Sequence, residues 1–396
     1  MQQQRQRRFS KLFSKTPIAW LQLTYQMRRF FTASLGIAAA VTLMFAQLGF
    51  LGALNDSNTV LHKQLRAELV MLSPETEALV LLQNFSRRRL YQALALDEVE
   101  SVTPMYFARA NFKNVKDGRN QVIIMFGINP ENSVFGFPTL DAQLTTINEP
   151  DTVLFDRYSR PEYGTVVADL EAGERVLAEI DGEDIEIGGI VDFLGVSFGI
   201  NGSIVTSDIN FLRLSPQQHP ENIALGFITL KPDADPAAVA AKLNALIPSD
   251  ALTLTKEDFI VREEGYWRSA TPVGFIFQTG AVVGFLIGMY IVYQILYTDI
   301  SDHIPDYAIL KAKGYQKSYF WGMLVQEAAI LSVSSFIPGY LLALVLYRIV
   351  KAGTNLPIYM PHDRAIIVFC MTIFMCVVSG LLVSKKLDES DPADLF

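Results

Sequence analysis

The chain has 396 residues, of which 50% are hydrophobic and 19% charged, and its formal net charge is −8. Residues 55–272 alone carry 18 basic and 32 acidic side chains, a net of −14, whereas the remainder carries +6. An acidic segment of this size argues against nucleic acid as a partner, and a basic remainder suits the anionic inner leaflet of a lipid bilayer.

Residues 1–29 are basic and are predicted to be a cytoplasmic segment. Thr16-Pro17 has the pattern of a helix start, because threonine is a good N-cap and proline fits the first helical position. The following apolar residues recur at helical spacing, which predicts a short amphipathic helix at the inner membrane interface. A plain extension of the first membrane helix is the alternative.

Four apolar stretches are long enough to cross about 30 Å of hydrocarbon, which takes about 20 helical residues. Three of them contain no charged residue, and the third in chain order contains only Glu327. Because backbone polar groups must bond internally in lipid, each stretch is predicted to be a transmembrane helix. The predicted helices cover residues 30–54, 273–298, 319–347 and 365–384. The first is longer than the apolar core of a signal peptide and is expected to remain as an anchor.

Lysine and arginine set the predicted orientation, because they concentrate on the cytoplasmic side of membrane proteins. They cluster before the first helix, in the loop 299–318 and in the tail 385–396. Both termini and this loop are therefore predicted to be cytoplasmic. The large segment 55–272 and the short loop 348–364 are predicted to lie outside.

The outer segment 55–272 is predicted to be an α+β domain on two helical stalks, residues 55–68 and 256–268. Its two ends alternate strand-like and helix-like runs with the spacing of a split-βαβ subdomain. Its middle, about 129–221, has many turn residues and short strand-like runs, which predicts an inserted β-rich subdomain. The predicted strands and helices lie at 69–72, 87–96, 103–113, 121–128, 175–180, 185–191, 202–206, 223–230, 235–246 and 251–254.

Motifs for catalysis are absent from the sequence. It contains no phosphate-binding G-x-x-x-x-G-K-[ST], no G-x-S-x-G and no H-x-x-x-H pattern. One acidic run could form a metal site, but a solvated hairpin turn explains it equally well. Its members are Asp181, Glu183, Asp184 and Glu186. We therefore predict a chain with no catalytic residue, no metal and no cofactor of its own.

Two features of the membrane helices suggest close packing. Gly280, Gly284 and Gly288 recur every four residues, which lets another helix approach closely, either in the same chain or in a second copy. Glu327 lies early in the third helix, where a carboxylate must face protein or water. A structural bond and a proton relay are its two alternative roles. Pro338 is expected to kink the same helix.

The loop between the second and third membrane helices carries a short helix pattern. Pro305 opens it, apolar residues alternate with charges, and Gly314 supplies a left-handed cap that ends it. A short, capped helix between two membrane helices can transmit a push to both of them. The alternative is an ordinary connecting loop.

This loop resembles the coupling helix of MacB/FtsX-type ABC transporter permeases, whose signature reads roughly E-I-G-x-x-[RK]-A-x-G-A. Glu327 matches an early acidic residue of the family's third helix, and the tail from Asp391 to Leu395 resembles its closing D-P-[AV]-E-A-L. The variant A-x-L-K-A-x-G-Y is most similar to DevC-type permeases of cyanobacterial glycolipid exporters. Departures from the wider family are Asp306 for Glu, Ala308 for Gly and Tyr315 for Ala. The resembling residues are Asp306, Tyr307, Ala308, Ile309, Leu310, Lys311, Ala312, Lys313, Gly314 and Tyr315.

The resemblance implies a homodimeric permease of the cell inner membrane with a periplasmic domain. It implies a partner ABC ATPase that binds ATP and Mg²⁺, a periplasmic membrane-fusion adaptor and a TolC-like outer-membrane channel. In such machines the ATPases move the coupling helices and the stalks carry this motion outward, driving export of a glycolipid or similar amphiphile. Related alternatives are a lipoprotein-releasing permease and a scaffold that activates cell-wall hydrolases; the size of the outer domain favours a transporter.

Overall fold

The computed structural model describes residues 27–305, 309–310 and 313–389, which fall into two compact units. The first, here called the membrane unit, contains residues up to 51, residues 276–349 and residues from 359 onward. The second, the outer unit, contains residues 52–275 and 350–358. The predicted amphipathic helix before residue 27 lies outside the described residues.

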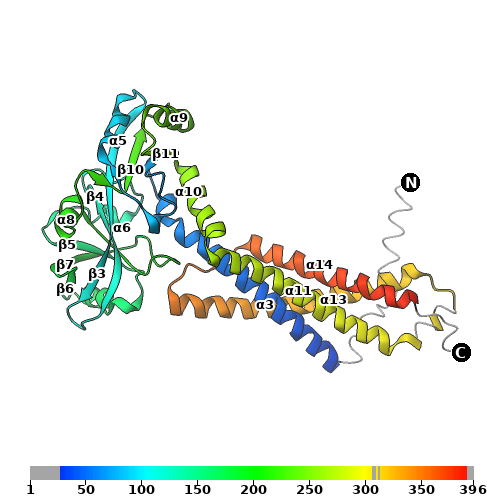
Figure 1. The fold of residues 1–396 in the computed structure, drawn as a ribbon. Coiled ribbons are helices and arrows are strands. Elements are labelled where there is room, and N and C mark those ends of the chain that lie inside the picture. The colour runs from blue at the N-terminus through cyan, green and yellow to red at the C-terminus, as the bar shows by residue number, and fades with distance from the viewer. Residues whose placement is uncertain (1–26, 306–308, 311–312, 390–396) are drawn as a thin grey trace. The chain divides into compact units, whose positions relative to one another are not determined.

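Four helices of the described chain are long and apolar enough to cross a membrane, as the sequence predicted (Figure 1). They are α3 (Met27–Asn58), α11 (Pro272–Asp302), α13 (Lys317–Thr354) and α14 (His362–Glu389). The third helix continues past the predicted end at residue 347, so the loop before α14 is shorter than predicted. The helix stops where Asn355 takes a left-handed φ of 57°.

Helix α3 lies inside the membrane unit. Of the most apolar 18-residue stretch of each helix, 56% is buried in α3, against 22% in α11 and 28% in α13. Ile37, Val41 and Phe45 are fully buried in one apolar core, which Leu296 of α11 and Ala328 of α13 share. The other helices leave broad apolar faces uncovered, as expected for surfaces that meet lipid.

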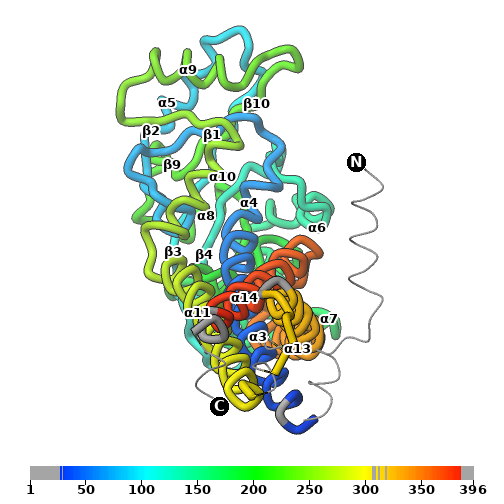
Figure 2. The backbone as a smooth tube through the Cα atoms, turned by 90° about the vertical axis from the view of Figure 1, so that its right-hand side faces the viewer, coloured from blue at the N-terminus to red at the C-terminus, as the bar shows by residue number. Residues whose placement is uncertain are grey.

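One half of the outer unit is an antiparallel sheet with the strand order β11-β1-β10-β3. With the helices it follows the chain order strand–helix–strand–strand–helix–strand, which is the split-βαβ arrangement that the sequence predicted. Leu90 of α5 and Leu243 of α9 pack into the same apolar core as Leu69 and Met71 of β1. Figure 2 shows α5 and α9 at the same end of this unit as β1 and β10. The elements are β1 (Leu69–Leu72), α5 (Arg87–Gln92), β3 (Val99–Asn114), β10 (Leu225–Leu230), α9 (Pro236–Leu246) and β11 (Leu252–Thr255).

The other half of the outer unit is a closed barrel. The long strand β3 bends into it, and the pairings run β3-β4-β8-β5-β7-β6 and from β6 back to β3. The circuit closes where Phe112 of β3 is in register with Ile180 of β6. Phe112, Phe155 and Tyr163 pack their rings together in the core. The further strands are β4 (Asn120–Ile128), β5 (Thr152–Asp156), β6 (Val176–Ile180), β7 (Glu183–Val191) and β8 (Ser203–Ser207).

The inserted subdomain begins earlier than the predicted residue 129, because β4 and the second half of β3 belong to the barrel. The strand β5 was not predicted. It is a fully buried run of five residues, and such a run lacks the alternation that marks a half-buried strand. Short elements connect the strands: α4 (Val60–Lys63), η1 (Leu79–Leu81), β2 (Phe85–Ser86), η2 (Ala93–Ala95), α6 (Pro138–Asp141), η3 (Thr146–Asn148), η4 (Pro161–Tyr163), α7 (Val166–Glu171), α8 (Asp208–Leu214) and β9 (Asn222–Ile223).

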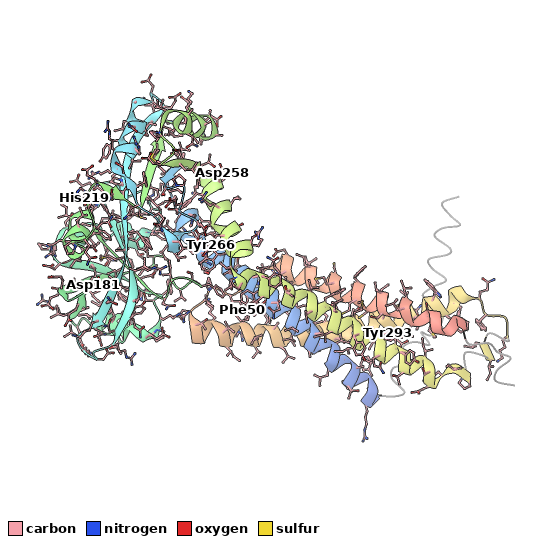
Figure 3. All side chains as sticks on the ribbon, viewed as in Figure 1. Phe50, Asp181, His219, Asp258, Tyr266 and Tyr293 are labelled. Atoms are coloured by element: carbon pink, nitrogen blue, oxygen red, sulfur yellow. The ribbon has the colours of Figure 1, made fainter. Side chains whose placement is uncertain are left out.

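The first stalk is shorter than predicted. Helix α3 ends at Asn58 and α4 ends at Lys63, so residues 65–68 are not helical. The backbone of Leu65 forms a β-bridge with Phe135 instead of continuing the helix. The returning stalk is helical over the predicted range, as α10 (Lys256–Gly265) and the π-helix η5 (Tyr266–Ala270), and Figure 3 labels Asp258 and Tyr266 on it.

The acidic run forms a hairpin turn between β6 and β7, the position labelled Asp181 in Figure 3. Asp181 and Gly182 have φ values of 49° and 95°, as a two-residue type I′ turn requires. Asp181 accepts hydrogen bonds from Asn111, and Glu186 pairs with Arg175. No group of three or more His, Cys, Asp or Glu is placed to hold a metal among the residues that the structure describes.

Candidate functional site

The loop between α11 and α13 carries the coupling segment predicted from the sequence. The structure describes Ile309, Leu310, Lys313, Gly314 and Tyr315. The other members of the predicted site lie outside the described residues; they are Asp306, Tyr307, Ala308, Lys311 and Ala312. The geometry below therefore concerns the end of the segment.

The described end of the segment closes as a helix does. The amide of Lys313 donates to the carbonyl of Ile309 at 3.0 Å, and the amide of Tyr315 donates to that of Leu310 at 3.2 Å. The second bond spans six residues, which is the mark of a Schellman cap. Gly314 has the left-handed φ of 87° that this cap requires. A Cβ on Gly314 would meet no atom within 4 Å, so the requirement for glycine is conformational and not steric.

The same segment has an anchored side and an exposed side. Leu310 packs against the apolar core of the membrane unit. Ile309 is 50% exposed and Tyr315 is 44% exposed, and the Tyr315 ring lies 4.7 Å from that of Tyr319 at the start of α13. A partner that pushed on the exposed side would therefore act through Leu310 and Tyr319 on the helix bundle.

The three glycines of α11 face other helices of the same chain. A Cβ on Gly280 would lie 2.5 Å from the Gln47 side chain, and one on Gly284 would lie 3.3 Å from Leu43, both on α3. A Cβ on Gly288 would lie 3.0 Å from that of Ala40 on α3, and Met375 of α14 would be closer still. Of the two alternatives for this stripe, the structure shows packing within the chain.

Two glycine contacts escaped the sequence analysis. A Cβ on Gly49 would lie 2.2 Å from the hydroxyl of Tyr347, and one on Gly339 would lie 2.8 Å from the side chain of Val41. A signal was present in smaller residues: Gly339 stands four residues from both Ser335 and Ala343, and Ala53 follows Gly49 at the same spacing. They tie α3 to α13, as the α11 stripe ties α3 to α11.

Glu327 is 2% exposed and lies on α13 among core residues of the membrane unit. Leu324, three residues before it, and Leu331, four residues after it, lie on the same face of the helix and are buried in that core. The carboxylate thus faces protein, as either of its predicted roles requires.

In the outer unit, burial raises the pKa of the Asp156 carboxyl, although the amide of Gly195 and the hydroxyl of Ser203 donate to it and oppose the shift.

Comparison with curated proteins gives no match to this chain. Among solved structures, the periplasmic region of MacB from Actinobacillus actinomycetemcomitans is similar with a TM-score of 0.34 and 9% identity, over 49% of this chain and 91% of that one. The extracellular domain of the noncanonic ABC-type transporter YknZ from Gram-positive bacteria gives a TM-score of 0.31 and 12% identity, over 48% and 98%. Residues 279–391, which contain the capped loop, match the model of the FtsX-like permease C-terminal domain.

Proposed function

We propose that this chain is the permease subunit of an ABC transporter of the MacB/FtsX type. The observation that supports this most directly is the family match over residues 279–391, which contains the Schellman-capped loop segment. The outer unit, with its α+β sheet and closed barrel, is inserted between the first and second membrane helices. In this arrangement a movement of the cytoplasmic loop is transmitted through the membrane helices to a folded domain on the other side of the membrane.

In the proposed mechanism a separate ATPase binds the exposed side of the coupling segment and moves it during each ATP cycle. Leu310 and the Tyr315–Tyr319 contact pass the movement to α11 and α13. The interface with α3 is close-packed at Gly284 and Gly288, so the helices move as packed bodies that shift between discrete arrangements. The stalks α4 and α10 then carry the change into the outer unit.

The proposed cargo is a glycolipid or similar amphiphile, exported by a homodimer through a periplasmic adaptor and an outer-membrane channel. This part rests on the sequence variant A-x-L-K-A-x-G-Y at residues 308–315, which resembles the DevC-type permeases. In this proposal the chain itself hydrolyses no ATP, and both ATP and Mg²⁺ bind to the partner ATPase.

Site-directed cross-linking tests the contact with the ATPase. Cys370 and Cys376 are first replaced by alanine, and Tyr315→Cys is introduced at a position that is 44% exposed. In membranes that contain the co-expressed ATPase, a short bifunctional reagent should join the two chains. Ile337→Cys, 56% exposed on α13, is the matched control and should not react with the ATPase. If both positions cross-link equally, or neither does, the proposed contact is wrong.

A further inference from the structure

A buried histidine and a buried carboxylate join the two stalks inside the outer unit. His62 on α4 is 0% exposed and Glu263 on α10 is 2% exposed. The Nε2 atom of His62 lies 3.5 Å from Oε2 of Glu263. The pair is separated by about two hundred residues of sequence, and neither side chain belongs to the coupling segment.

Glu263 is held in place by two other donors. The backbone amide of Leu79 donates to Oε2 at 2.8 Å, and the indole Nε1–H of Trp267 donates to Oε1 at 2.8 Å. Trp267 belongs to the π-helix between α10 and α11, and its ring would meet a Cβ on Gly199 at 3.1 Å. The carboxylate therefore links three segments: the returning stalk α10, the segment at Leu79, and the π-helix that precedes the second membrane helix.

His62 is less well satisfied than its partner. Its ring packs against that of Phe259 in a tilted arrangement with 4.0 Å between centroids, but neither ring nitrogen makes a hydrogen bond to any residue that the structure describes. The 3.5 Å separation from Glu263 is too long for a hydrogen bond. Burying a polar group without a hydrogen-bond partner destabilises the folded state. A proton on the ring would add both a donor and a positive charge facing the carboxylate.

Few other charges face this pair. A small pocket opens beside Glu263, and its polar lining apart from that carboxylate is Ser57, Asn58 and Ser197. On the first stalk Lys63 pairs with Asp56, and both are partly exposed. On α10, Arg262 donates to the backbone carbonyls of the segment at residues 74–76. Among the described residues, Glu263 is therefore the carboxylate that faces the His62 ring within 4 Å.

We propose that His62 and Glu263 form a proton-dependent clasp between the incoming and outgoing stalks. At lower pH the imidazole gains a proton and Nε2–H donates to Oε2 of Glu263, which draws α4 and α10 together. At higher pH the imidazole is neutral and the clasp loosens. An imidazole changes its charge between about pH 5 and pH 8, so the stalks would respond to the pH of the compartment in which the outer unit lies.

Amide hydrogen exchange on the full-length protein in lipid nanodiscs tests the clasp. Peptides from residues 57–66 and 256–270 are followed at pH 6 and pH 8, and rates are corrected for the intrinsic pH dependence of exchange. The wild-type protein should exchange about three to ten times more slowly at pH 6 in both peptides, because the folded state binds the extra proton. His62→Gln should remove this difference. His219→Gln is the matched control, since His219 is exposed in the same unit, and it should keep the wild-type difference.

The proposal is overturned if the wild-type rates do not depend on pH after correction, or if His62→Gln retains the dependence. Glu263→Gln should also remove it; its amide keeps one acceptor oxygen, so one of the two donors, the Leu79 amide or the Trp267 indole, retains its bond. If Glu263→Gln does not fold, His62→Phe, whose ring can still pack against Phe259, serves as the second variant and should show no dependence. The readout requires neither ATPase nor transport, so its outcome is independent of the proposed permease function.

Discussion

Tyr347 of α13 donates its hydroxyl to the backbone carbonyl of Phe45 on α3, and its ring crosses the backbone at Gly49. A Cβ at position 49 would lie 2.2 Å from this hydroxyl, so the contact requires glycine. A buried side chain that fills the space above a glycine locks two helices at one separation. The part of α3 around Gly49 is thus fixed to α13 by ring packing and by one hydrogen bond.

We expect Gly49→Ala to destabilise the protein by about 1–3 kcal/mol, because the added methyl group overfills the interface. In a Tyr347→Leu background the same change should cost less, since the phenol ring is gone. Thermal unfolding of the four proteins of this double-mutant cycle, in one detergent, gives the coupling energy. Strictly additive effects would show that Tyr347 does not occupy the space above Gly49.

The glycine stripe of α11 gives a graded prediction. Gly284→Ala should be nearly neutral, because the new Cβ would lie 3.3 Å from a flexible leucine, whereas Gly288→Ala would bring a methyl group to 3.0 Å from Ala40. The methyl side chain of Ala40 has no alternative rotamer that would relieve the contact. We therefore expect Gly288→Ala to lower the free energy of unfolding by about 1–3 kcal/mol. Unfolding midpoints should separate the two variants, while their oligomeric state by light scattering should be the same. A loss of oligomers without a change in midpoint would instead place the stripe between copies.

Local signals in the sequence predicted local structure well. The strand β1 has its predicted limits, and β3 and β4 are joined by a turn in which Gly118 takes a φ of 70°. The Gly314 cap was predictable for the same reason, because a helix end needs only its own few residues. Contacts between distant segments left no such signal. The β-bridge of Leu65 with Phe135 ends the first stalk early, and nothing near Leu65 indicates it.

Neither the closure of the barrel nor the clasp between the stalks could be predicted from the sequence, and the reason is the same for both. Phe112 pairs with Ile180, and His62 meets Glu263, only after the chain has folded around them. Apolar periodicity identifies a strand or a helix but not its partner. This is why the α+β class was predicted correctly while the strand order of the barrel and the partners of α3 were not.

An ion pair of the barrel should make the outer unit sensitive to acid. Lys116 donates to Asp169, and with Thr165 it lowers the pKa of that carboxyl. A lowered carboxyl pKa adds stability above the ordinary value of about 3.9, and this is lost as the pH falls through the lower value of the folded protein. Lys116→Met should therefore lower the unfolding temperature slightly at pH 6 and leave it unchanged near pH 2. The difference at pH 6 should shrink in 1 M salt, because Lys116 is exposed to solvent and Asp169 is partly accessible; a difference that grows with salt would contradict an ionic origin.

The coupling segment yields the most direct functional prediction. Gly314→Ala introduces a side chain at a φ of 87°, where an L-residue costs about 1–2 kcal/mol, although a Cβ there has open space around it. Gly322→Ala is the matched control: its Cβ also has open space, but it lies within α13 at an ordinary helical φ, where alanine is favoured. Both variants should insert into membranes in normal amounts. With the ATPase present, Gly314→Ala should reduce permease-stimulated ATP hydrolysis and export severalfold, because the frayed cap no longer presents Ile309 and Tyr315 in fixed positions. If Gly314→Ala and Gly322→Ala both hydrolyse ATP and export at the wild-type rate, the cap has no part in coupling.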